Sequence, residues 1–537
     1  MSKRNESILW LAVLFLAALV RLAPIGASLP YIDYIDEGYV LHQTIHLLNK
    51  RALDTAWYGY PSLPAYLNAV ALISWSPIYR QVHGHSFRRD LPREENAQTS
   101  SGYNYDLISP PELILAGRLI TAALSIGTVF LAGVIAFRLR GGATGFLALL
   151  ITALCPALVL RASNVIVDPF ATFFGLLAIY LSGLIRPNER LIALPAAAAA
   201  GFAAGLAFAS KYGAGAVFAA VLFVIWMSPV TMKSRLRLGF IACAGLLSGI
   251  GLGAPATFFH SQAVMHDVAI TAGNYYVITS SPGYFGQAIG GLELGWPLAI
   301  AGAAGIVLML RRRETRSAAI AWMIFAVVLL APFVNRPFQP FRNLLPLVPP
   351  FCIAAAIAFS DVLDWAWEKR RPLLRAATLV LIGVCSATLA LPLYRPIRQR
   401  MTHSDSRVQA IDWLQRHATR EQSVLGIREL AILPAEWRRL GATATVLSLF
   451  DTSQNLESDH FDYIVTGDFD LRYAPDGAGV AASLERWKQK TASFVTAAEF
   501  GAGPAFVVPY LWRGNDERIV VLRSNTAKSA VTAESAR

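Results

Sequence analysis

Residues 10–24 of the chain read WLAVLFLAALVRLAP, and residues 31–50 read YIDYIDEGYVLHQTIHLLNK. The first stretch belongs to an apolar run long enough to cross a membrane, since a bilayer core needs about 20 apolar residues per helix. The second stretch follows closely and carries three acids, Asp33, Asp36 and Glu37. An apolar span that opens into an acidic segment predicts a membrane protein with a candidate site at the membrane surface.

The composition of the whole chain agrees with this prediction. Hydrophobic residues make up 55% of the 537 residues and charged residues only 15%, whereas about a quarter of an average soluble domain is charged. The net charge of +12 does not indicate a nucleic-acid partner, because Lys and Arg also gather in the cytoplasmic loops of membrane proteins. The four cysteines fall in apolar runs, so we expect buried thiols and no disulfides.

Hydropathy predicts eleven transmembrane helices. They lie near residues 8–26, 113–137, 143–160, 167–185, 191–209, 213–230, 238–258, 286–310, 317–334, 343–360 and 375–394. A shorter apolar stretch, YPSLPAYLNAVALISW at residues 60–75, would break the charge alternation of all later connectors if it were a span. We therefore predict a helix in the membrane interface there. The first span could instead be a signal peptide, but no small-residue cleavage site follows its apolar core.

The connectors between these spans alternate in charge. One set holds seventeen basic residues: Lys3, Arg4, Arg138, Arg140, Arg186, Arg190, Lys233, Arg235, Arg237, Arg311, Arg312, Arg313, Arg316, Lys369, Arg370, Arg371 and Arg375. The other short connectors hold four: Arg161, Lys211, Arg336 and Arg342. Because Lys and Arg accumulate in cytoplasmic loops, the N-terminus is predicted to be cytoplasmic and the C-terminus extracytoplasmic.

This topology places two polar segments outside the cytoplasm. Residues 1–394 are predicted to form a transmembrane domain whose first extracytoplasmic loop covers residues 27–112, and residues 395–537 a small C-terminal domain. In that tail DWLQRHA (412–418) has a helical pattern, while FDYIVTG (461–467) and ERIVVLR (517–523) are typical of strands. We therefore predict an extracytoplasmic α/β domain with a disordered end.

The acids are the first candidates for chemistry. If the segment is helical, Asp33, Asp36 and Glu37 share one face, where their repulsion could be relieved by a cation or could raise one pKa to suit a general base. The alternative is a solvated helix start, where acids are favoured by the helix dipole. A further acid, Asp168, stands before a proline in LRASNVIVDPFATFF (160–174), at the predicted outer end of another span. Two acids on separate elements at one membrane face favour a site.

The order of these features resembles the GT-C glycosyltransferases. It comprises a first span, an acidic DE pair in the first outer loop, YPSLPAYL (60–67), the Asp-Pro pair, SKYGAG (210–215) and FRNLLPLVPP (341–350). Within that group the chain resembles the bacterial branch near the protein O-mannosyltransferases (glycosyltransferase family 39) and the lipid A aminoarabinose transferase, over residues 8–394. The resemblance implies a polytopic α-helical fold and transfer of a sugar from a polyprenyl-phosphate carrier to an acceptor hydroxyl on the outer face.

The resemblance also implies roles for individual residues. Asp36 matches the family's candidate base, Glu37 the acid beside it and Asp168 the second acid. Lys211 and Arg342 are the best-placed cations for the departing phosphate, although both could be interfacial anchors. Two further substrate-binding candidates are Tyr60, in a Tyr-Pro position that shapes a groove or anchors the interface, and Arg118, which could pair with an acid.

Other classes of function stay open at this point. A secondary transporter would show an internal repeat and broken helices at mid-span, and no repeat is visible. A non-catalytic membrane assembly protein of the same fold is the other alternative. No cofactor is implied, although His42 with His46, or His83 with His85, could hold a divalent metal. The predicted partners are a polyprenyl-phosphate-linked sugar, a lipid, glycan or protein acceptor and membrane lipids, in a bacterial cytoplasmic membrane.

Overall fold

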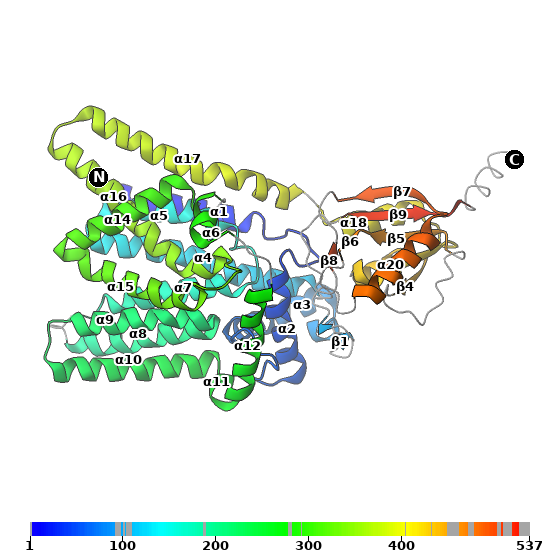
Figure 1. Ribbon diagram of the computed structural model, residues 1–537, viewed down its shortest axis with the longest axis horizontal. Helices are drawn as coiled ribbons and strands as arrows, with labels where there is room; N and C mark the ends of the chain where they lie inside the picture. Colours follow the sequence, from blue (N-terminus) through cyan, green and yellow to red (C-terminus); the bar gives the residue numbers. More distant parts are fainter. Residues whose placement is uncertain are drawn as a thin grey trace. The chain divides into compact units, whose positions relative to one another are not determined.

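The computed structural model describes residues 3–91, 98–99, 102–103, 110–185, 190–277, 282–290, 293–402, 404–430, 432–447, 461–470, 477–501, 506–507 and 518–525. The chain forms two compact units (Figure 1): residues 1–25, 43–86 and 115–401 make up the first, and residues 26–42, 87–114 and 402–537 the second. Two parts of the predicted outer loop thus group with the C-terminal residues. The boundary near residue 394 stays a prediction.

The first unit is built of helices. They are α1 (Lys3–Leu22), α3 (Leu63–His83), α5 (Gly142–Leu154), α6 (Pro156–Val159), α7 (Val167–Ser182), α8 (Arg190–Ser210), η3 (Tyr212–Ala216), α9 (Val217–Met227), α10 (Met232–Gly253), α11 (Ala256–Phe259), α12 (Ser261–Val277), α13 (Tyr284–Gly290), α14 (Trp296–Arg311), α15 (Arg313–Leu330), η4 (Ala331–Phe333), η5 (Phe341–Leu347), α16 (Val348–Glu368) and α17 (Pro372–Thr402). Helices α2 (Ile35–Lys50) and α4 (Pro111–Arg140) each begin in the second unit's ranges and end in the first unit's.

Many of these helices are apolar enough for a bilayer. In the described part of the chain six segments are long and apolar enough to cross one: residues 111–140, 193–210, 232–253, 313–333, 341–368 and 372–417. Four shorter apolar helices cover residues 142–154, 167–182, 212–227 and 296–311. Together with α1 they overlap every predicted span, and the protein is a multi-pass membrane protein. The count of eleven spans and the orientation stay predictions.

Several predicted spans are interrupted where backbone chemistry requires it. The span predicted at 143–160 breaks between α5 and α6, because Pro156 at the start of α6 has no N–H to continue the ladder. The span predicted at 286–310 divides into α13 and α14, and Gly295 before α14 has a φ of +74°, a backbone conformation that favours glycine. Hydropathy alone did not show these breaks.

Close glycine contacts join α8 to α10. A Cβ atom on Gly201 would lie 2.0 Å from the carbonyl oxygen of Ala242, and one on Gly249 would lie 2.4 Å from that of Phe202. Gly205 and Gly245 have equally close backbone neighbours on the facing helix. Both helices thus carry glycines four residues apart, the small-residue pattern that lets membrane helices approach closely.

A buried arginine joins the first helix to its neighbours. Arg21 of α1 is fully buried, and its Nε donates a hydrogen bond to the Ser125 hydroxyl on α4 at 2.8 Å. Its Nη1 donates to the carbonyl oxygen of Ala153 on α5 at 2.9 Å. Such contacts satisfy a buried guanidinium, which would otherwise be costly in this setting. Hydropathy does not mark Arg21, because it lies inside an apolar run.

The second unit contains a five-stranded sheet (Figure 1). Its strands follow the order β4 (Thr443–Leu447), β3 (Ser423–Ile427), β5 (Tyr463–Gly467), β9 (Ile519–Arg523) and β7 (Val495–Phe500). Strand β3 is parallel to β4 and β5, whereas β9 is antiparallel to β5 and β7. The unit also holds η1 (Phe87–Arg89), β1 (Gln98–Thr99), β2 (Gly102–Tyr103), α18 (Ser406–His417), η6 (Arg428–Leu430), α19 (Pro434–Arg439), β6 (Phe469–Asp470), α20 (Gly477–Thr491) and β8 (Phe506–Val507).

The predicted elements of the tail are confirmed. The stretch DWLQRHA ends α18, FDYIVTG contains β5 and ERIVVLR contains β9. The core packs α18 and α19 on the sheet through buried side chains such as Ile411 and Trp437. Gly426 on β3 allows the Trp437 ring to pack closely on the sheet, because a Cβ atom there would lie 2.4 Å from that ring. The C-terminal part is therefore a small α/β fold, as the patterns indicated.

Candidate functional site

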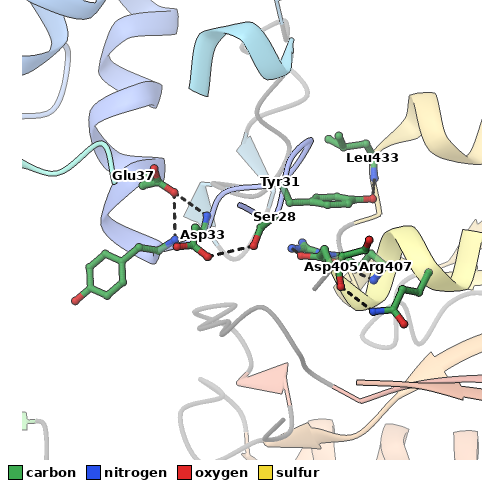
Figure 2. A network of polar contacts seen from close by, with 10 residues as sticks. Ser28, Tyr31, Asp33, Glu37, Asp405, Arg407 and Leu433 are labelled. Atoms are coloured by element: carbon green, nitrogen blue, oxygen red, sulfur yellow. Dashed lines mark hydrogen bonds and ion pairs between the residues drawn. The ribbon is translucent and has the colours of Figure 1, made fainter. Parts of the chain in front are cut away.

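The acid-bearing segment is a turn followed by the first turn of α2 (Figure 2). The Glu37 carboxylate accepts hydrogen bonds from the backbone N–H groups of Asp33 at 2.7 Å and Tyr34 at 3.2 Å, and Glu37 is fully buried. These N–H groups precede the helix, and a Glu at its third position commonly reaches back to satisfy them. Glu37 therefore closes the N-terminus of α2.

The other two acids of this segment are also buried. Asp33 lies before the helix, and its Oδ1 accepts a hydrogen bond from the Ser28 hydroxyl at 3.1 Å. Asp36 lies in the first turn of α2 and is only 4% exposed. The expectation of three acids on one helical face is wrong for Asp33, because the helix begins at Ile35.

The same segment is anchored to the C-terminal elements of its own unit (Figure 2). The Arg407 guanidinium lies over the ring of Tyr31 at 3.7 Å from the centroid. It also donates two hydrogen bonds to the Asp405 carboxylate, at 2.7 and 2.6 Å. The Leu433 N–H donates to the Tyr31 hydroxyl at 3.4 Å. Burial raises the pKa of Tyr31 above its ordinary value, although the charge of Arg407 opposes the shift, so this phenol is neutral.

A second polar cluster lies in the first unit. The Lys211 ammonium donates to Oδ1 of Asp168 at 2.5 Å and to Oδ1 of Asn343 at 2.8 Å. Asp168 and Asn343 are each 1% exposed, and the Lys211 side chain is 17% exposed. The three side chains come from the first turn of α7, the residue before η3 and the helix η5. Side chains from two other elements, remote in sequence, thus hold the ammonium group of Lys211.

Local backbone structure explains why these side chains meet. Asp168 is in the first turn of α7, where a carboxylate is favoured and the following Pro169 is tolerated. Lys211 has extended backbone between the end of α8 and η3. Arg342 directly precedes Asn343 in η5 and is half-buried.

The remaining predicted residues have structural contacts. Arg118 is fully buried, and its Nη1 donates to the carbonyl oxygen of Ile25 at 3.0 Å. The expected pairing of Arg118 with an acid stays a prediction. Tyr60 is half-buried, its ring meets that of Trp57 edge-on at 5.5 Å and its carbonyl oxygen accepts a hydrogen bond from Gln43.

The histidines that could have held a metal have other neighbours. The ring of His83 stacks on Tyr79 at 4.1 Å, and that of His85 lies 6.2 Å from the same ring. Within the described ranges no group of three or more His, Cys, Asp or Glu side chains is arranged to hold a metal ion.

The loop between α2 and α3 also makes contacts that the sequence did not predict. The Tyr58 hydroxyl donates to Asp54 at 2.7 Å, and its backbone N–H donates to Asp267 of α12 at 2.8 Å. The hydroxyl of Tyr212 donates to the carbonyl oxygen of Tyr58 at 2.9 Å. Burial, and next the hydrogen bond to Asp54, raise the pKa of Tyr58. Helix α12 therefore packs on the loop that leads to Tyr60.

The structure thus pairs Asp168 with Lys211 in the first unit, whereas Asp36 and Glu37 lie in the second. Asn343 and the pair of Tyr31 with Arg407 were not predicted. Asn343 lies inside the stretch FRNLLPLVPP, and Tyr31 begins the acidic stretch. An uncharged amide and a tyrosine carry no distinctive signal in a single sequence.

The chain is similar to a known protein family over part of its length and to solved structures over most of it. Residues 103–253 match the model of the dolichyl-phosphate-mannose-protein mannosyltransferase family. No curated protein matches the chain in a sequence comparison. Among solved structures, ArnT from Cupriavidus metallidurans bound to undecaprenyl phosphate is similar with a TM-score of 0.54 at 13% identity, over 97% of this chain and 98% of that one.

A second solved structure supports the same fold. The oligosaccharyltransferase from Archaeoglobus fulgidus tethered with an acceptor peptide has a TM-score of 0.51 at 12% identity, over 93% of this chain and 73% of that one. At such identities the likeness is one of fold. The protein has a GT-C fold like that of ArnT, and its residues 103–253 are similar to the dolichyl-phosphate-mannose-protein mannosyltransferase family.

Proposed function

We propose that this protein is an inverting glycosyltransferase that moves a sugar from a polyprenyl-phosphate carrier to an acceptor hydroxyl on the outer face of the membrane. The observation that carries the proposal is the Lys211 ammonium group held between Asp168 and Asn343. The likeness to ArnT, which was solved with undecaprenyl phosphate, supports a lipid phosphate as the leaving group. The acceptor is a lipid, a glycan or a protein.

The geometry of Lys211 suits recognition of a phosphate. An ammonium group has three N–H donors, and Asp168 and Asn343 accept two of them at 2.5 and 2.8 Å. The third remains for a phosphate oxygen, whose negative charge grows as the glycosidic bond breaks. Arg342 adjoins Asn343 in the chain and is the second cation proposed to contact this phosphate. In this role Asp168 orients Lys211 and is not itself a base.

Asp36 and Glu37 have different proposed roles. The carboxylate of Glu37 is occupied by two backbone N–H groups, which favours Asp36 as the general base of the DE pair. Asp36 would take the proton of the acceptor hydroxyl while that oxygen attacks the anomeric carbon and the carrier phosphate departs with the bonding electrons. One displacement inverts the anomeric configuration. Tyr60 and Arg118 are the further residues proposed to bind the substrates.

A transfer assay tests the proposal against a transporter or an assembly protein of this fold. Purified protein would be incubated with radiolabelled polyprenyl-phosphate hexoses and pentoses and an envelope extract as acceptor. We expect label to move from the carrier to the extract in the wild type and not in Asp36→Asn. The proposal is overturned if no carrier-linked sugar is consumed while vesicles containing the protein take up or flip the labelled donor.

A further inference from the structure

An apolar groove lies between α9 and α10, on a part of the first unit that the proposed reaction does not use. It has a volume of about 540 Å³. Its lining residues include Trp226 from α9 and Arg235, Leu236, Gly239, Phe240 and Cys243 from α10, and Arg235 is the one charged residue among all those that line it. The groove is therefore almost wholly apolar and holds a single cation.

The walls of this groove are open to the outside of the helix pair. Phe240 is 77% exposed, Leu236 is 65% exposed and Trp226 is 50% exposed. A Cβ atom on Gly239 would meet no atom within 4 Å, so this glycine leaves space where other α10 glycines make tight contacts. Both helices belong to the apolar segments of a membrane protein, so hydrocarbon is the surrounding medium.

The cation at one end of the groove is oriented and lacks an acidic partner. Nε of Arg235 donates to the carbonyl oxygen of Ser228 at 3.2 Å, and the guanidinium lies 5.6 Å from the centre of the Trp226 ring. Among the described residues no Asp or Glu forms an ion pair with it. Lys233 and Arg237 add two more positive charges to the same helix start.

We propose that this groove binds one anionic phospholipid, with the phosphate at Arg235 and an acyl chain along Leu236, Gly239 and Cys243. Eight residues separate Arg235 from Cys243, which is roughly 12 Å along a helix. The site thus offers a charged end and an apolar length in the order that a lipid presents them. A guanidinium suits a phosphate because its N–H groups form paired hydrogen bonds. Basic residues beside a membrane helix attract anionic lipids in the same way.

The cysteines of the chain provide a local probe of this site. Cys155, Cys352 and Cys385 are buried, but the expectation of a buried thiol is wrong for Cys243, which lines the groove and is exposed. N-ethylmaleimide should therefore modify the folded protein at Cys243. Protein in detergent micelles would be supplemented with phosphatidylglycerol or, in parallel, with phosphatidylcholine, and the rate of alkylation would be followed. We expect phosphatidylglycerol to slow the reaction at least fivefold more than phosphatidylcholine does.

Three variants make the test specific. Arg235→Gln should abolish the difference between the two lipids and weaken phosphatidylglycerol retention in native mass spectrometry about tenfold. Gly239→Leu should fill the groove and reduce the retained lipid while the fold is kept. Arg237 is an exposed cation on the same helix that does not line the groove. Arg237→Gln should therefore behave like the wild type.

Three results would overturn this inference. One is an equal rate of Cys243 alkylation with phosphatidylglycerol and phosphatidylcholine in the wild type. Another is an equal loss of protection in Arg235→Gln and Arg237→Gln, which would mean that diffuse surface charge attracts the lipid. If inorganic phosphate alone protected Cys243 as well as phosphatidylglycerol does, the groove would be a phosphate site and not a lipid site. Sugar-transfer activity is not needed for any of these measurements.

Discussion

The ammonium group of Lys211 lies 2.5 Å from Oδ1 of Asp168, although 43 residues separate the two in the chain. Asp168 is 1% exposed and its second carboxylate oxygen has no hydrogen-bond partner in the described part of the chain. Breaking a buried pair by removing one partner is strongly destabilising, because it leaves an uncompensated charge. The pair therefore fixes the position of Lys211 and keeps its charge beside η5.

The first prediction concerns recognition of the carrier phosphate. Lys211→Ala and Arg342→Ala should each weaken binding of undecaprenyl phosphate by about 1.5 to 3 kcal/mol, the usual range for a hydrogen bond to a charged group. Titration calorimetry in detergent would measure this. Arg336→Ala is the matched control, because Arg336 belongs to the same predicted outer connectors but lies over the ring of Tyr276. If all three variants bind the lipid like the wild type, Lys211 and Arg342 are membrane anchors.

The second prediction separates the two members of the DE pair. Asp36→Asn should lower kcat by about a hundredfold or more, the typical contribution of a general base, while donor binding survives. Glu37→Gln should chiefly affect stability, because this side chain caps α2. A cap contributes about 0.5 to 2 kcal/mol. Steady-state kinetics and thermal unfolding of both variants measure the contrast.

A third substitution controls this comparison. Asp33→Asn should reduce turnover less than Asp36→Asn does, because Asp33 precedes the helix and its Oδ1 is bonded to Ser28. Near wild-type transfer by a folded Asp36→Asn protein would remove Asp36 as the base. A hundredfold loss in Glu37→Gln at unchanged stability would assign that role to Glu37 instead.

The third prediction concerns the anchor of the acidic segment. Arg407→Met should cost about 3 to 5 kcal/mol of unfolding free energy, since it leaves the Asp405 carboxylate buried without its guanidinium. The double variant Asp405→Asn with Arg407→Met should recover most of that loss, because Asn also caps α18. Thermal unfolding with a double-mutant cycle measures the coupling. Additive effects of the two changes would show that the pair does not hold the segment.

The fourth prediction concerns the contact between α8 and α10. Gly249→Ala places a Cβ atom 2.4 Å from the carbonyl oxygen of Phe202, so the helices must separate, and overpacking of this kind costs about 1 to 3 kcal/mol. Gly239→Ala on the same helix meets no atom and should be neutral or stabilising, because Ala is the better helix former by about 1 kcal/mol. Thermal unfolding in detergent compares them. Equal midpoints would contradict the close approach.

The fifth prediction concerns orientation. The 17 to 4 distribution of Lys and Arg over the connectors predicts that everything after about Arg395 lies outside. An alkaline phosphatase fused at Ser404 should therefore be active, and a cytoplasmic fluorescent reporter fused at the same site should be dark. The reverse pattern would move the C-terminal domain into the cytoplasm and remove the basis for chemistry on the outer face. A phosphatase fused after Arg313 is the control and should be inactive.

Much of the architecture could be predicted from local pattern. Runs of apolar residues predicted a helix at every span, because in hydrocarbon a backbone must satisfy its own hydrogen bonds. Alternating and helical patterns in the tail predicted α18, β5 and β9. Asp168 and Lys211 stood out because a charge at a membrane boundary is costly unless it is used.

Local pattern failed where the outcome depends on the exact residue at which a helix begins or ends. Hydropathy could not place the breaks before Pro156 and Trp296, because it averages over a window and does not register where a single proline or glycine ends the backbone ladder. It likewise did not predict the capping role of Glu37, which depends on the position at which α2 begins.

The sequence by itself determined that the chain is a multi-pass membrane protein with acids next to its first helix and an α/β tail. Only the tertiary structure decided that Lys211 is held by Asp168 and Asn343, and that Tyr31 lies under Arg407. The physical reason is that hydropathy and helical period are properties of neighbouring residues, whereas an ion pair or a ring contact depends on which distant elements pack together. That packing follows from the shape of whole helix faces, such as the glycines between α8 and α10, and not from any one motif.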